Sequence, residues 1–159
     1  MEFDERMNEL IAGITSPWIM CIILFIIPSI ILWRQKNKKV LKQLWLSIIA
    51  TGIIAVLIKF IVQRQRPFEP EYFFGSIPDY SFPSLQTAVA FAAIPFLWNM
   101  FQAPKYWSVL RRKARILFVS YAVIIMWSRV ILQEHYASDV IVGALIGIGI
   151  GTIIQKIIK

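Results

Sequence analysis

The sequence predicts an all-α membrane protein, a bundle of about five transmembrane helices preceded by a short amphipathic helix. Hydrophobic residues make up 58% of the 159 residues, which is more than an ordinary soluble domain contains. Five apolar stretches have close to the roughly 20 residues that a helix needs to cross a bilayer. Lys and Arg gather in the short segments between these stretches, as in membrane proteins with a fixed orientation. Residues 1–159 are expected to form a single domain.

The first expected element is a short helix that lies on the membrane surface, over residues 3–14. Its apolar residues recur at helical spacing: Phe3, Met7, Leu10, Ile11 and Ile14. The acids of this segment have the wrong charge for the start of a cleavable signal peptide. We therefore expect the first apolar span to remain in the protein.

Five longer apolar stretches follow, and each is predicted to be a transmembrane helix. They cover residues 17–33, 44–62, 84–101, 115–132 and 140–158. Pro95 interrupts the third, where neighbouring helices can satisfy the freed backbone groups. In the last span Gly143, Gly147 and Gly151 form a ridge of small residues that lets another helix approach closely. We expect this ridge to pack within the bundle, and a homo-oligomer seam is the alternative.

The charged residues predict how the spans are oriented. Segments 34–42 and 103–115 each carry five Lys or Arg and the carboxyl end adds Lys156 and Lys159, so twelve of the seventeen cations share one side. All nine Asp and Glu residues fall on the other side. The positive-inside rule then predicts a multi-pass protein of the cell membrane, with the amino end outside and the carboxyl end in the cytoplasm. The net charge of +8 is a topology signal, so membrane lipids are expected partners and nucleic acid is not.

Four further cations lie on the acidic side, near the ends of spans. They are Lys59, Arg64, Arg66 and Arg129. Lys59 and Arg129 fall within or at the rim of apolar helices, where an ionisable side chain is costly and marks a functional site by default. For each cation taken alone, the alternative is a side chain that reaches to the membrane surface and anchors the helix.

Two polar clusters on the acidic side favour an anion site. Lys59 and Arg66 are seven residues apart, so two turns of helix would bring both to one face, and Pro67 would help to end that helix. Pro83 and Ser84 open the third span. The free backbone N–H groups of a helix start bind phosphate readily, and the Ser84 hydroxyl would be a further donor.

A third cluster contains the residues suited to attack. Ser128 and Arg129 are followed by His135 and then by Asp139. At a spacing of four residues, His135 and Asp139 would share a helix face. Asp139 could then hold the imidazole in one tautomer and leave its other nitrogen free to attack.

Taken together, the three clusters resemble the signature motifs of the type 2 phosphatidic acid phosphatases. These motifs are a Lys followed by Arg-Pro, a Pro-Ser-x-His, and a Ser-Arg followed by His and Asp. The resemblance covers residues 59–139 by motif and the whole chain by its pattern of spans. It implies a lipid phosphate or diphosphate substrate, no metal or other cofactor, and a phosphohistidine formed on His135. It also implies these roles: His135, Asp139 and Arg129 catalytic; Lys59, Arg66, Ser84, Leu85, Gln86 and Arg129 substrate-binding, with the amides of Leu85 and Gln86 in the oxyanion site.

The second motif departs from the family pattern. The chain has Gln86 where the family has a histidine that protonates the leaving group, and His135 is its single histidine. An amide can donate a hydrogen bond but cannot act as a general acid. The substitution is either natural or an engineered inactivating change.

The resemblance leaves several functions open. The first is hydrolysis of a lipid phosphate or diphosphate. Within it, a polyprenyl diphosphate is the first candidate substrate, as in undecaprenyl-diphosphatase-like enzymes, and phosphatidylglycerophosphate or phosphatidate is the next. The second is a phosphotransferase that passes the group to an acceptor other than water. The third is a lipid-phosphate binder without catalysis, because the acid is missing at Gln86.

Overall fold

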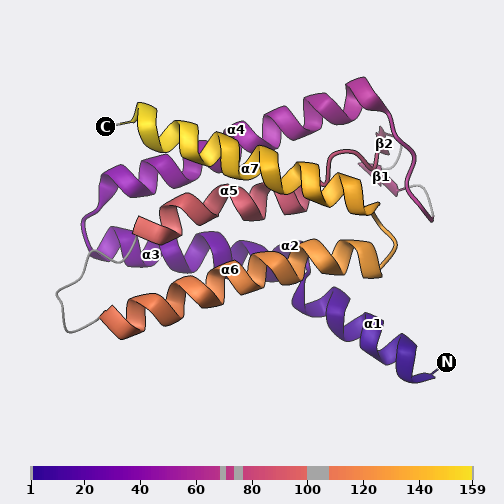
Figure 1. The fold of residues 1–159 in the computed structure, drawn as a ribbon, viewed down its shortest axis with the longest axis horizontal. Helices are drawn as coiled ribbons and strands as arrows, with labels where there is room; N and C mark the ends of the chain where they lie inside the picture. The colour runs from indigo at the N-terminus through magenta and orange to yellow at the C-terminus, as the bar shows by residue number, and fades with distance from the viewer. Residues whose placement is uncertain (1, 69–70, 74–76, 100–107, 159) are drawn as a thin grey trace.

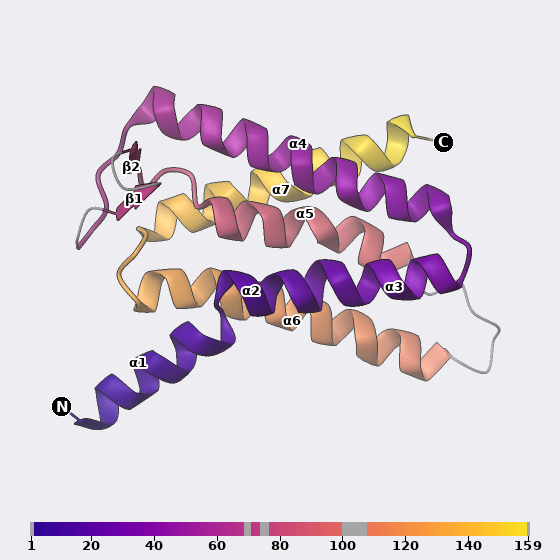
Figure 2. The same ribbon diagram turned by 180° about the vertical axis from the view of Figure 1, so that it is seen from behind.

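The computed structural model describes residues 2–68, 71–73, 77–99 and 108–158, and these parts of the chain are mostly helical. The helices are α1 (Glu2–Ile14), α2 (Pro17–Cys21), the π-helical turn η1 (Ile22–Ile26), α3 (Ile27–Arg34), α4 (Lys38–Val62), α5 (Leu85–Asn99), α6 (Ser108–Ile131) and α7 (Ala137–Ile157). The long helices run side by side, and α1 projects from one end of the bundle at an angle (Figures 1 and 2). The predicted all-α fold class and the predicted N-terminal helix are confirmed.

The first predicted span is one continuous helical rod made of α2, η1 and α3. It begins at Pro17, whose fixed φ suits the first position of a helix. The rod widens into the π-helical turn η1 directly before Pro28. Proline has no N–H to donate to the preceding turn, and a widened turn is one way a helix accommodates it.

Three other helices begin earlier than their apolar stretches. α4 begins at Lys38 instead of residue 44, α6 at Ser108 instead of 115, and α7 at Ala137 instead of 140. Asn37 caps α4, because its side-chain oxygen accepts a hydrogen bond from the Val40 amide at 3.3 Å. Hydropathy predicts only the apolar part of a helix, whereas backbone hydrogen bonds continue the helix into the charged segments.

Composition marks three described stretches as long and apolar enough to cross a membrane. They are Glu5–Arg34, Lys38–Val62 and Ala137–Ile157, and the apolar part of α5 is shorter, at Leu85–Leu97. Large apolar side chains such as Trp18, 82% exposed, and Leu117, 66% exposed, cover the outside of the bundle. Soluble monomers rarely expose so much apolar surface, and here a bilayer would cover it.

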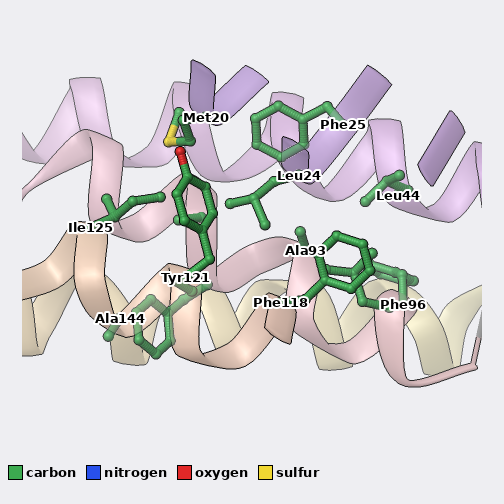
Figure 3. Close-up of a cluster of buried hydrophobic side chains, with 14 of the residues drawn as sticks. Met20, Leu24, Phe25, Leu44, Ala93, Phe96, Phe118, Tyr121, Ile125 and Ala144 are labelled. Carbon is green, nitrogen blue, oxygen red and sulfur yellow. The ribbon is translucent and has the colours of Figure 1, made fainter. Parts of the chain in front are cut away.

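The core of the bundle surrounds α5. Figure 3 shows buried side chains from α2, η1, α4, α5, α6 and α7 that meet between the helices. Leu24, Leu44 and Ile125 are fully buried there, and Phe96 of α5 is 1% exposed. α5 is therefore the element against which the others are positioned.

α5 and α7 approach each other through the glycine ridge. A Cβ atom on Gly147 would lie 2.1 Å from the carbonyl oxygen of Ala88, and one on Gly143 would lie 2.7 Å from that of Ser84. Such distances leave no room for a side chain, so the backbones of the two helices touch. The predicted packing of this ridge within the bundle is confirmed, and the ridge is covered by α5.

The segment between α4 and α5 contains a feature that was not predicted. The chain leaves α4 at Gln63, which adopts a left-handed conformation with φ of 51°. Strands β1 (Glu71–Phe73) and β2 (Ile77–Asp79) then pair antiparallel, with Glu71 opposite Asp79. Strands of three residues are too short for an alternating pattern to be recognised in a sequence. The Ser81 amide donates to the Arg64 carbonyl at 2.7 Å, which brings the end of the segment back to its start.

Candidate active site

The three sequence clusters meet at one end of the bundle. The end of α4, the hairpin, the start of α5, the α6–α7 connection and the α1–α2 corner all lie there (Figures 1 and 2). A cavity of about 590 Å³ opens among them. Its polar lining consists of Lys59, Arg66, Asp79, Gln86, Arg129, Glu134 and His135, and its apolar lining of Pro17, Met20, Ile48, Gly52, Leu85 and Val89.

Lys59 and Arg66 converge, as predicted, but on a carboxylate that the sequence analysis missed. Asp79 accepts from the Lys59 Nζ through Oδ1 at 2.6 Å and from the Arg66 Nη2 through Oδ2 at 2.5 Å. α4 ends at Val62, so the turn at Gln63, and not a shared helix face, brings Arg66 to the cavity. Two buried cations converge on one carboxylate, and both are groups that commonly bind phosphate.

Arg129 is held from three directions in the last turn of α6. Its Nη1 donates to Glu134 Oε2 at 2.6 Å, its Nη2 to Thr15 Oγ1 at 2.8 Å and its Nε to Ser128 Oγ at 3.2 Å. The side chain is 5% exposed and lines the cavity. Because it lies deep in the site and not at the lipid surface, the anchoring interpretation does not fit Arg129.

His135 and Asp139 lie close together, as predicted, but they do not share a helix face. α7 begins at Ala137, so His135 precedes the helix, and its Nδ1 lies 3.8 Å from Asp139 Oδ2. The Ser81 carbonyl is the nearer partner, at 2.7 Å from Nδ1. A carbonyl accepts only from a protonated nitrogen, so in the neutral imidazole Nδ1 carries the hydrogen and Nε2 has the lone pair.

Ser81 links Asp139 to the imidazole as well, because its hydroxyl lies 3.4 Å from Nδ1. The Ser81 hydroxyl donates to Asp139 Oδ2, and the Tyr136 amide donates to the same oxygen at 3.0 Å. Oδ1 accepts from Arg64 Nη1 at 2.8 Å, and that guanidinium lies over the Tyr136 ring. Arg64 therefore stabilises the α6–α7 connection, a role that its sequence position did not reveal.

The residues of the second motif lie at the start of α5. Leu85 and Gln86 line the cavity, and their amides belong to the first turn, where backbone N–H groups have no partner within the helix. Ser84 is fully buried, and its hydroxyl donates to Thr87 Oγ1 at 3.0 Å. A role for this hydroxyl in phosphate binding requires it to turn away from Thr87, and it stays a prediction.

No metal cluster is found in the part of the chain that the structure describes. Within residues 2–68, 71–73, 77–99 and 108–158, no group of three or more His, Cys, Asp or Glu side chains could hold a metal ion. The charged groups of the site are instead the cations and carboxylates described above.

The family is decided by the sequence profile of the PAP2 superfamily, which matches residues 40–159. This chain belongs to the PAP2 superfamily. The matched range includes the three clusters at residues 59–139, and the predicted resemblance is confirmed. It begins in α4, and the PAP2 match therefore leaves α1 to α3 outside.

Similar proteins agree with this assignment. The lipid A 1-phosphatase of Rhizobium etli is 28% identical over 173 residues, covering 90% of this chain and 66% of the relative. The chain thus spans a little under two thirds of that protein. Among solved structures, the transmembrane PAP2 type phosphatidylglycerolphosphate phosphatase of Bacillus subtilis has a TM-score of 0.76 at 21% identity, covering 95% of this chain and 76% of the other. LpxE of Aquifex aeolicus has a TM-score of 0.66 at 26% identity, covering 97% and 86%. The fold is that of membrane PAP2 proteins.

Proposed function

We propose that this protein hydrolyses a phosphate or diphosphate group at the head of a membrane lipid. The observation that carries the proposal is one cavity whose polar lining includes Lys59, Arg66 and Arg129 together with His135, and whose remaining lining includes six apolar residues. Three cations suit a phosphate head, and the apolar lining suits the adjoining part of a lipid. Membership of the PAP2 superfamily and the names of the similar proteins support the same reaction.

The geometry supports attack by His135. Nε2 carries the free electron pair and would form a bond to phosphorus, while the bond from phosphorus to the lipid oxygen breaks. The Ser81 carbonyl on Nδ1 would stabilise the imidazolium of the phosphohistidine. Water would then cleave the phosphorus–nitrogen bond and release phosphate. Phosphoryl transfer depends mostly on positioning and charge stabilisation, which the buried cations supply.

Two carboxylates hold the cations in the structure as it stands. Asp79 lies between Lys59 and Arg66, and Glu134 lies on Arg129. Each carboxylate occupies a position that a phosphate oxygen would take, so we expect head-group binding to displace at least part of these ion pairs. The exchange replaces one anion by another, and the buried cations stay paired throughout.

A polyprenyl diphosphate, such as undecaprenyl diphosphate, is our first candidate substrate. Gln86 cannot protonate a leaving group, and a diphosphate expels a phosphorylated lipid that departs more easily than an alkoxide. The competing function is a lipid-phosphate binder. It is favoured by the position of the Gln86 amide, whose Nε2 donates to the Thr15 carbonyl at 2.6 Å.

The functional test is phosphate release by the purified protein from lipid monoesters and diphosphates of matched chain. If the protein is a hydrolase, it should release inorganic phosphate from at least one of these lipids. A phosphotransferase would move the group to an added alcohol without releasing phosphate, and a binder would retain the lipid unchanged. Either of the last two results would overturn the proposal.

We also propose that the cavity faces the outside of the cell and that the α3–α4 connection faces the cytoplasm. In a variant lacking Cys21, a cysteine at Gln65 is expected to react with an impermeant reagent in intact cells. A cysteine at Lys38, which is exposed at the other end of α4, should react only after permeabilisation. Labelling of position 38 but not position 65 in intact cells would reverse the orientation.

Conservative changes of the two arginines are expected to damage the site. Arg66 donates to the Asp79 carbonyl at 3.0 Å, to its carboxylate and to the Glu134 carbonyl at 3.3 Å, and a lysine cannot reproduce this planar fork. Arg66→Lys and Arg129→Lys should each lower kcat/KM by about tenfold or more. The exposed Arg112, replaced by Lys, is the matched control. If both site variants matched the control, neither guanidinium would take part in binding.

A further inference from the structure

The corner between α1 and α2 carries a residue that belongs to the site although it lies far from the motifs. Thr15 follows the last residue of α1, Ile14, and is fully buried. It also lies outside residues 40–159, which the family profile matches. Both of its oxygens nevertheless accept hydrogen bonds from residues that line the cavity.

The hydroxyl of Thr15 has a fixed direction. It donates to the Ile11 carbonyl at 2.6 Å, so its lone pairs are left to accept from Arg129 Nη2 at 2.8 Å. A hydroxyl has one hydrogen to give. The bond to Ile11 therefore sets the hydroxyl as the acceptor for Arg129.

Thr15 differs from Glu134, the other partner of the Arg129 terminal nitrogens, in carrying no charge. A phosphate group competes directly with the Glu134 carboxylate at Nη1, because both are anions. The neutral hydroxyl on Nη2 does not compete for charge in this way. When a head group replaces Glu134, the bond to Thr15 can remain and keep the plane of the guanidinium in place.

Two further hydrogen bonds dock the corner itself onto the bundle. Gln86 of α5 donates to the Thr15 carbonyl at 2.6 Å, and Tyr121 of α6 donates through its hydroxyl to the Ile14 carbonyl at 2.9 Å. Gln86 stands where the family has its proton donor. In this chain its amide instead ties the N-terminal segment to the cavity.

We propose that Thr15 is a positioning residue that directs the guanidinium of Arg129 at the bound phosphate, and that Gln86 and Tyr121 dock the corner that carries it. This proposal depends on the proposed function only in the experiments that measure turnover of a lipid. Binding of inorganic phosphate reports on it separately, because the guanidinium must be directed at the anion whether or not a bond is cleaved.

The test compares Thr15→Val, which keeps the shape but removes the acceptor, with Thr15→Ser, which keeps the acceptor. Thr15→Val is expected to weaken the binding of inorganic phosphate about tenfold, the lower range for a hydrogen bond to a charged group. Thr15→Ser should retain most of the affinity. With the best lipid, kcat/KM should fall in Thr15→Val and recover in Thr15→Ser.

A double-mutant cycle separates positioning from general destabilisation. In an Arg129→Lys background, Thr15→Val should cost much less than it does alone, because the guanidinium that Thr15 positions is already gone. Ser16→Ala is the control, since Ser16 lies in the same corner but its hydroxyl accepts from the Ile19 amide of α2, at 3.5 Å. Its phosphate affinity should equal that of the unaltered protein.

Three results would overturn the proposal: unchanged phosphate affinity in Thr15→Val, an equal loss with and without Arg129, or no phosphate binding by the unaltered protein. Failure of the proposed function looks different. It would appear as absent turnover of every lipid, while the ordering of the variants in phosphate binding stayed as expected.

Discussion

Replacing His135 with alanine is expected to abolish turnover, with a fall of about 10⁴-fold or more in kcat, as for the removal of other catalytic nucleophiles. His135 is 5% exposed, lines the cavity and presents Nε2 as the free nitrogen of its ring. The described residues offer no second imidazole, since the chain contains one histidine. Phosphate release and trapping of an acid-labile phosphoenzyme are the two measurements.

The controls for His135 separate attack from binding. His135→Ala should still bind inorganic phosphate, because the three cations remain. Asp139→Asn should slow attack while leaving ligand binding largely intact, since Asp139 acts on the imidazole through the Ser81 hydroxyl. Asp139 also pairs with Arg64, so folding of this variant must be checked by thermal melting. Full activity in His135→Ala would remove the phosphohistidine mechanism.

The second large effect is expected for Gln86→His, and it should depend on the lipid. A lipid monoester expels an alkoxide, a poor leaving group, so restoring a proton donor should recover most of the roughly 10²–10⁴-fold that general acid catalysis supplies. A diphosphate expels a phosphate monoester whose second pKa is about 6, so it departs largely without a proton. We therefore expect a much larger gain for the monoester than for the diphosphate.

The measured quantity is the ratio of the two rate gains on lipids of the same chain. Gln86→Leu is the matched control, because it also breaks the bond to the Thr15 carbonyl but supplies no acid. A gain in hydrolysis rate that occurs in Gln86→His but not in Gln86→Leu is therefore caused by proton donation. Equal gains for both lipids, or a larger gain for the diphosphate, would contradict the prediction.

Much of the site could be predicted from the sequence, because ionisable residues in apolar spans are conspicuous. Lys59, Arg66, Arg129 and His135 all line one cavity, as the convergence of their motifs predicted. Charges in such spans need a partner or a function. The prediction did not require knowledge of how the helices pack, only that their ends meet at the same depth.

The partners of these residues could not be predicted in the same way. Asp79, Ser81 and Thr15 lie in a short hairpin, a loop and a helix corner, where no periodic pattern indicates which side chains turn inward. Ser81 acts partly through its backbone carbonyl, which any residue type would provide. His135 and Asp139 lie within 3.8 Å of each other, as predicted, but not on one helix face, because His135 precedes α7.

The glycine ridge between α5 and α7 also sets a distance within the site. The proposed oxyanion donors at the start of α5 and the proposed nucleophile just before α7 are separated by touching backbones, and the Ser84 amide donates directly to the Asp139 carbonyl at 3.1 Å. At Gly143 and Gly147 the contact is made by backbone atoms, so the distance between the start of α5 and the start of α7 does not depend on side-chain rotamers. Lys59, Arg66 and Arg129 instead reach the cavity on long side chains with several torsions. The backbone contact of α5 with α7 therefore fixes the distance between the proposed nucleophile and oxyanion donors, whereas side-chain hydrogen bonds fix the positions of the cations.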